Sequence, residues 1–230
     1  LQAIDRLIQA DRSAYVVTPN VDHIVQLETS KELQAVYENA SLILTDGKPL
    51  LWIAKWYGTP IKEKISGSDL FPLLCDMAAK KGYKMFFLGA AEGVAAKAAE
   101  NLANKFKGLQ VVGTYSPPFG FEKNQDEMDK IKSMIKEAAP HILIVGLGCP
   151  KQEKFMYHHC KELGVPISFG LGASFDFEAG NIKRAPRWMS NHGLEWLFRI
   201  TQDPKRMAKR YLIDDRKILG LAIKYRKIGG

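Results

Sequence analysis

Paired cysteines are missing from this chain of 230 residues, as are long apolar runs. Cys75, Cys149 and Cys160 lie far apart and form no C-x-x-C motif, which disfavours a disulfide framework and a structural zinc site. No apolar run reaches the roughly 18 residues that span a bilayer, and the N-terminus shows no signal-peptide pattern. We therefore expect a cytosolic protein that does not cross the membrane. The first residue is Leu1 rather than Met, so we also expect a piece or processed form of a longer protein.

The two best-known nucleotide-binding loops are absent as well. There is no G-x-G-x-x-G and no G-x-x-x-x-G-K-[ST], which disfavours an NAD-dependent oxidoreductase and a P-loop NTPase. The five histidines are scattered, and Asp176-Phe177-Glu178 is interpreted as a short structural turn rather than as a pair of metal ligands. We expect neither a metal nor another cofactor.

The positive charge is confined to the C-terminal part. Residues 1–178 hold 20 Lys and Arg against 21 Asp and Glu, a net charge of −1, whereas residues 179–230 hold 13 against 4, a net of +9. Such a division predicts a body at 1–178 and a basic appendage at 179–230. It favours a polyanionic partner for the appendage: a nucleic acid, an anionic membrane or a phosphate-bearing substrate. The alternative is a solvated basic helix face.

Hydrophobic patterning predicts an α/β fold. Apolar residues make up 46% of the chain, which is ordinary for a globular protein. Short apolar, β-branched stretches alternate with longer amphipathic ones, which predicts a Rossmann-like, mostly parallel sheet with helices on both faces. The predicted strands are 15–18, 41–45, 85–88, 109–114, 141–145 and 166–169. The predicted helices of the body are 22–39, 49–57, 70–80, a helix ending near 105, 126–138 and 151–163.

The appendage is predicted to be helical. Helices are expected at 187–199, 204–213 and 215–227. The last has a broad apolar face flanked by Lys and Arg, formed by Ile218, Leu219, Leu221, Ala222, Tyr225 and Ile228. This pattern is typical of a helix that lies on an anionic membrane, and equally of one that packs on its own body.

Polar loops follow four of the predicted strands. In open α/β sheets the ligand binds beyond the carboxyl ends of the strands. Thr18 and Asn20 could contact a sugar or phosphate, although Asn20 could equally cap a helix. Asp46 directly follows a strand, where it could act as a general base or simply form a turn with Gly47.

The other two loops are rich in small residues. Gly89 and Gly148 end strands and precede helices, so that backbone N–H groups could approach a diphosphate. Lys151 and Gln152 begin the second of these helices and suit an anionic or sugar-bearing ligand.

A set of motifs spread over nearly the whole chain resembles the WecG/TagA/CpsF family, glycosyltransferase family 26. The ordered set is far more specific than any one piece. Its members are Thr18-Pro19-Asn20, Thr45-Asp46-Gly47, Gly67-Ser68-Asp69-Leu70, Phe87-Leu88-Gly89, residues 145–153 and residues 172–196.

This resemblance implies an inverting, metal-independent transferase. It implies transfer of a sugar, N-acetylmannosamine or a related hexose, from a UDP-sugar to a polyprenyl-diphosphate-linked acceptor during synthesis of cell-surface polysaccharide. The place implied is the inner face of the plasma membrane, with the appendage reaching the membrane and completing the site. The family's base aligns with Asp46, and its substrate-contacting residues align with Thr18, Asn20 and Gln152.

Cations are expected to neutralise the leaving diphosphate, with the appendage as their source. The candidates are Arg187, Arg199, Arg206 and Arg210. Lys64 stands where family members often carry Arg, and it keeps the charge but loses the planar bidentate fork.

Two questions stay open at this level. A non-catalytic nucleotide- or RNA-binding protein would also explain the basic appendage, but no nucleic-acid-binding module is recognisable, so no nucleic acid partner is expected. The sequence also leaves open whether the chain is a monomer or a homo-oligomer.

Overall fold

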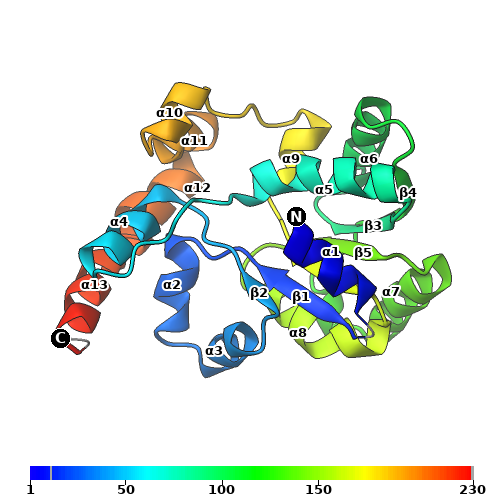
Figure 1. The fold of residues 1–230 in the computed structure, drawn as a ribbon, viewed down its shortest axis with the longest axis horizontal. Coiled ribbons are helices and arrows are strands. Elements are labelled where there is room, and N and C mark those ends of the chain that lie inside the picture. Colours follow the sequence, from blue (N-terminus) through cyan, green and yellow to red (C-terminus); the bar gives the residue numbers. More distant parts are fainter. Residues whose placement is uncertain (11, 229–230) are drawn as a thin grey trace.

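The computed structural model describes residues 1–10 and 12–228, except for the side chains of Arg187, Asn191, Arg206, Lys227 and Ile228. Its centre is a six-stranded sheet in the order β2-β1-β6-β5-β3-β4, with parallel pairing throughout (Figure 1). The strands are β1 (Ala14–Val17), β2 (Leu42–Ile43), β3 (Lys84–Gly89), β4 (Gln110–Tyr115), β5 (Ile142–Gly146) and β6 (Ile167–Gly170).

Helices cover both faces of this sheet. The helices of the body are α1 (Gln2–Gln9), α2 (Val21–Leu27), α3 (Lys31–Glu38), α4 (Lys48–Trp56), α5 (Gly67–Lys81), α6 (Val94–Lys105), the 3₁₀ turn η1 (Phe121–Lys123), α7 (Gln125–Ala138), α8 (Lys151–Leu163) and α9 (Ser174–Ala179). Helices α1, α5, α6 and α9 bury one face, and α3, α7 and α8 bury the other. The predicted fold class is confirmed.

Alternation along β1 explains why the sheet is buried on both sides. Ala14 and Val16 point into the core beneath α1 and α5, whereas Tyr15 and Val17 point into the core beneath α3 and α8. All four residues are buried. A strand that is apolar at every position is typical of a parallel sheet with two covered faces.

Several predicted boundaries are wrong. The helix predicted at 22–39 is two helices, because Ser30 begins α3 by accepting a hydrogen bond from the N–H of Leu33 at 3.2 Å. The strand predicted at 41–45 is paired only over Leu42–Ile43. Helix α1 was not predicted. Asp176 and Glu178 lie on the short helix α9 rather than in a turn.

The appendage consists of short helices. They are α10 (Arg187–Asn191), α11 (Glu195–Gln202), α12 (Pro204–Lys209), the π-helical turn η2 (Arg210–Asp214) and α13 (Lys217–Ile228). The helix predicted at 187–199 is divided by Gly193, which has a φ of 73°. Helix α13 lies beside α4 and α2 (Figure 1), and the Tyr57 hydroxyl donates to the carbonyl oxygen of Ala222 at 2.8 Å.

Helix α13 divides its apolar residues between the body and the solvent. Ile218 and Ala222 are buried, whereas Leu219 and Ile223 are 67% and 53% exposed. One side of the helix therefore packs on the body, as one of the two alternatives predicts, and the other side is exposed; binding to a membrane stays a prediction. Among the described residues, no helix combines the length and apolarity needed to cross a bilayer.

Candidate active site

Two cavities of about 410 Å³ each open at the carboxyl edge of the sheet. The first of them, the loop cavity, lies over the ends of β1, β5 and β6. Its lining residues include Thr18, Ser68, Gly148, Gln152 and Gly172. Glycines and small polar side chains leave backbone N–H groups accessible there, which suits a phosphate- or sugar-bearing ligand.

The second cavity, the appendage cavity, lies between the start of α4 and the helices of the appendage. Much of its lining is apolar, with Trp196, Leu212, Ile218 and Leu219 on its walls. Because Leu219 is also well exposed, the cavity reaches the outer surface of α13. An apolar ligand could enter by that route.

Four of the residues that the structure describes line both cavities. They are Asn20, Asp46, Arg199 and Arg210. All four are among the residues predicted from the sequence. The structure therefore brings a carboxylate, an amide and two guanidinium groups to the junction between a polar cavity and an apolar one.

The backbone on both sides holds Asp46 at this junction. The N–H of Asp46 donates to the carbonyl oxygen of Pro19 at 2.8 Å, and the carbonyl oxygen of Thr45 accepts from the N–H of Ile65 at 2.9 Å. Gly47 has a φ of 100°, a region that side chains disfavour, and it lets the chain turn directly into α4.

The surroundings of Asp46 make it more basic. Burial, with a smaller contribution from the nearby negative charge of Glu195, raises the pKa of Asp46 to about 6. Arg199, Lys64 and His23 oppose this rise with positive charge. A carboxylate whose pKa lies near neutrality can both accept a proton and be ionised under physiological conditions.

Asn20 is the hydrogen-bonding centre of the first loop. Its side-chain oxygen accepts from the N–H of Asp22 at 3.1 Å, so it does cap α2, and it also accepts from Arg210 at 3.1 Å. Arg210 contacts the Asp22 carboxylate at 3.4 Å as well. The neighbouring Thr18 is buried and donates to the carbonyl oxygen of Gly170 at 3.2 Å. These contacts tie the appendage to the end of β1.

Gln152 is buried at the start of α8. Its side-chain oxygen accepts from the N–H of Gly172 at 3.2 Å, and its amide donates to Glu153 at 2.7 Å. Gly148 lines the same cavity with a φ of 76°. Gly89 serves packing instead: a Cβ there would lie 2.4 Å from the carbonyl oxygen of Gly146, and Ala90 is the residue that reaches the cavity.

Two predicted lysines are engaged by carboxylates. Lys64 lines the appendage cavity, 3.6 Å from Glu195 and 3.9 Å from Asp69. Lys151 is bound to Glu122 at 2.6 Å and is not among the described residues that line either cavity.

The predicted arginines divide into two groups. Arg199 lines both cavities and lies 3.5 Å from Glu195. Arg210 joins it there. The side chains of Arg187 and Arg206 lie outside the described part of the structure.

Sequence reasoning missed three groups near the junction. Glu195 contacts both Lys64 and Arg199. Asp215 lines the appendage cavity, and burial raises its pKa to about 6. His23 and Glu153 form a buried pair at 3.2 Å. Glu153 and Glu195 lie within the family motifs, but their pairing with His23 and Lys64 joins segments distant in sequence, which no local pattern predicts.

The residues best placed to hold a metal ion differ from Asp176 and Glu178, the pair considered in the sequence analysis. Of Asp176 and Glu178, only Asp176 lines a cavity. His23, Cys149 and Glu153 instead place one ligand atom each within 4.8 Å of one another.

Comparisons with known proteins agree on one family. The model of the "Glycosyl transferase WecG/TagA/CpsF family" matches residues 1–229. An N-acetylglucosaminyldiphosphoundecaprenol N-acetyl-beta-D-mannosaminyltransferase of Bacillus spizizenii is 34% identical over 203 residues, which are 88% of this chain and 76% of the relative. A protein with the same description in Bacillus subtilis is 32% identical over 174 residues, 76% of this chain and 66% of the relative.

Proposed function

The chain belongs to the WecG/TagA/CpsF family of glycosyl transferases, and we propose that it transfers N-acetylmannosamine from UDP to a polyprenyl-diphosphate-linked N-acetylglucosamine. The transferred sugar and the acceptor follow the descriptions of its two relatives, which are named for an N-acetylmannosaminyl transfer to N-acetylglucosaminyldiphosphoundecaprenol, whereas the UDP carrier is the expectation from the sequence motifs. Transfer of this kind builds cell-surface polysaccharide.

The position of Asp46 between the two cavities carries this proposal. A glycosyl transfer joins two substrates of different character, and the reacting atoms must meet where their sites touch. The loop cavity suits the sugar nucleotide, because it is lined by glycines and polar side chains. The appendage cavity suits a lipid-linked sugar, because its walls include Trp196, Leu212 and Leu219.

The reaction we propose is a single displacement. Asp46 takes the proton from a hydroxyl of the acceptor sugar as that oxygen attacks the anomeric carbon of the donor. The new bond forms opposite the bond to the diphosphate, so the configuration inverts and UDP leaves. The pKa of about 6 allows Asp46 to be ionised, and hence active as a base, near neutral pH.

The remaining junction residues stabilise and orient the substrates. Arg199 and Arg210 supply positive charge to the leaving diphosphate, in the way that arginine clamps stabilise transferring phosphates. This favours transfer without a divalent cation. Thr18, Asn20 and Gln152 position the donor by hydrogen bonds. In this proposal the boundary near residue 178 separates the catalytic body from an appendage that completes the site.

We also propose that α4 and α13 bind the inner face of the plasma membrane. Trp52 and Trp56 of α4 are 57% and 45% exposed, Leu219 and Ile223 of α13 are 67% and 53% exposed, and the two helices lie next to each other (Figure 1). Arg226 stacks on the Trp56 ring at 4.4 Å. Apolar side chains with flanking cations are typical of helices that lie on anionic lipid. A lipid chain could then pass from the bilayer into the appendage cavity past Leu219.

The nucleic-acid alternative is less well supported. Several cations of the appendage are engaged by the body's own carboxylates rather than gathered on one free surface. These pairs are Arg184–Asp69, Arg210–Asp22 and Lys224–Glu28.

Incubation of the full chain with UDP-N-acetylmannosamine and a short-chain lipid-diphosphate N-acetylglucosamine tests the proposed reaction. We expect transfer in the presence of EDTA, with a β-linked product by NMR if the donor is the α anomer. Absence of transfer from any UDP-sugar would overturn the donor assignment, and strict magnesium dependence would overturn the role of the arginines. RNA binding that weakens steeply with salt would favour the alternative.

A further inference from the structure

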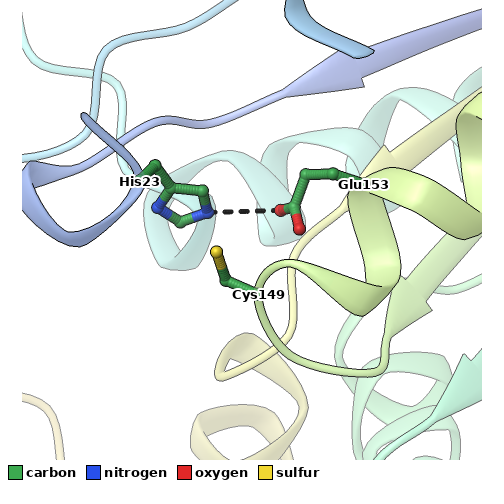
Figure 2. Close-up of side chains that lie close together, drawn as sticks. All are labelled: His23, Cys149 and Glu153. Atoms are coloured by element: carbon green, nitrogen blue, oxygen red, sulfur yellow. Dashed lines mark hydrogen bonds and ion pairs between the residues drawn. The ribbon is translucent and has the colours of Figure 1, made fainter. Parts of the chain in front are cut away.

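A His–Cys–Glu cluster lies beside the loop cavity and is not used by the proposed transfer. His23 comes from α2, Glu153 from α8, and Cys149 from the turn before α8, with its sulfur directed toward the other two side chains (Figure 2). His23 is 5% exposed and Glu153 is fully buried. Three segments of the chain therefore bring one nitrogen, one sulfur and one oxygen together within 4.8 Å.

The hydrogen bonds of His23 determine which ring nitrogen faces the cluster. Nδ1 lies 2.9 Å from the side-chain oxygen of Asn20. That oxygen is an acceptor, because it receives the N–H of Asp22. The backbone N–H of Asn20 also points at Nδ1, at 3.4 Å. Nε2 faces the Glu153 carboxylate at 3.2 Å, so either a proton on Nε2 or a cation can bridge the two groups.

A cation satisfies more of the cluster than a proton does. Oε2 of Glu153 is buried and has no hydrogen-bond partner in the described structure. A proton on Nε2 would engage only Oε1 and leave Oε2 without a partner. A metal ion could engage the carboxylate, the imidazole and the sulfur of Cys149 together.

We propose that His23, Cys149 and Glu153 form a binding site for a thiophilic divalent cation such as Zn²⁺. Nitrogen, thiolate sulfur and carboxylate oxygen are the ligands that Zn²⁺ prefers. Binding forms a metal–sulfur bond and releases the thiol proton to the solvent. Three protein ligands leave a fourth coordination position, which faces the loop cavity, because His23 and Cys149 line it.

The surroundings of the cluster resemble those of known metal sites. A histidine that ligates zinc usually donates its other N–H to a neighbouring oxygen, and Nδ1 of His23 lies 2.9 Å from the side-chain oxygen of Asn20. Gln26 donates to the Cys149 sulfur at 3.4 Å, and Gln152 donates to Glu153 at 2.7 Å. The ligands are thus oriented before any ion arrives. The inference goes beyond the proposed function and assigns the cation no step in the transfer.

Titration of the full chain with Co²⁺ tests the site without an activity assay. We expect one equivalent to bind with a thiolate-to-cobalt charge-transfer absorption that Zn²⁺ then displaces. Cys149→Ser should abolish this absorption. Cys160→Ser is the matched control, because Cys160 is a buried thiol on α8 that lies outside the cluster, and it should leave the absorption unchanged. His23→Gln should weaken Co²⁺ binding by about tenfold or more.

A second measurement uses the unaltered protein and so does not depend on how the variants fold. Zn²⁺ should slow the alkylation of Cys149 relative to that of Cys160, read by peptide mass spectrometry. No charge-transfer absorption in the unaltered chain, an absorption that persists in Cys149→Ser, or alkylation of Cys149 that is unaffected by Zn²⁺ would each overturn the proposal.

Discussion

The body and the appendage are held in place by different forces. The body buries apolar side chains on both faces of its sheet, in two large clusters. Beyond α9, the described side chains add only Met207, Ile218 and Ala222 to the buried hydrophobic residues, while residues such as Trp188 and Leu219 are largely exposed. The appendage therefore has no core of its own.

Ion pairs and helix contacts attach the appendage to the body instead. Arg184 pairs with Asp69, Arg210 with Asp22, and Lys224 with Glu28. Pairs exposed to solvent contribute only about 0–1 kcal/mol each. We infer that the body supplies rigidity and the base, whereas the appendage supplies cations and apolar surface on a less firmly held support.

The largest expected effect is that of Asp46→Asn in the body. A side-chain amide cannot take the proton from the attacking hydroxyl of the acceptor sugar. Turnover should therefore fall by about 10²–10⁴-fold, while UDP binding is retained. Steady-state turnover and equilibrium UDP binding measure the two quantities. Asp215→Asn is the control, because the pKa of Asp215 is also raised to about 6, but this residue lines only the appendage cavity. A loss in Asp215→Asn as large as that in Asp46→Asn would place the base in the appendage instead.

Arg210→Gln tests the cation that the appendage supplies. Loss of one group that stabilises transition-state charge typically costs about 10²–10³-fold in turnover, and we expect a loss of this order. The exposed neighbour Lys209 provides the matched control as Lys209→Gln. Equal losses in the two variants would mean that general positive charge, rather than the position of Arg210 at the junction, is what matters.

Trp52→Ala tests the apolar surface. Trp52 is 57% exposed on α4. Its removal should cost about 1.4 kcal/mol of apolar burial in the membrane, so we expect binding to anionic vesicles to weaken by about tenfold. Phe119→Ala is the control: Phe119 is fully exposed but lies in the loop after β4, at the opposite edge of the sheet from β2. Vesicle co-sedimentation measures both. An equal effect of the two variants would argue against a defined membrane face.

The smallest expected effect is a shift in the pH profile. Asp46 must be ionised to act, so kcat/KM should fall as the pH drops through about 6. Glu195 raises the pKa of Asp46, and its removal in Glu195→Gln should lower that pKa and move the acid limb to lower pH. Lys64 and Arg199, released from Glu195, would act in the same direction.

Glu195→Asp keeps the negative charge and provides the control for this shift. Its acid limb should stay closer to that of the unaltered protein. An acid limb that does not move in Glu195→Gln, or that moves to higher pH, would show that Asp46 is not the group whose ionisation limits the reaction.

Much of the site was predictable because its residues follow strands directly. Thr18 and Asn20 follow β1, and Asp46 lies three residues after β2, so their positions at one edge of the parallel sheet follow from the strand pattern alone. Gln152 was predictable for the same reason, at the start of the helix after β5. The pattern could not show that Gly89 serves close packing against Gly146, since that contact joins two strands far apart in sequence.

The sequence by itself determined the layered α/β fold, the strand-end loops and the concentration of positive charge in the last 52 residues, because periodicity, turn residues and charge are local properties. Only the tertiary structure decided that Asp46 lies between two cavities, that Arg199 and Arg210 line the same two cavities, and that His23 faces Glu153 across 130 positions of the chain. Those contacts join segments that meet only when the sheet has formed and the appendage has folded back over its edge. Burial and the charges of distant neighbours therefore set the chemistry of the site.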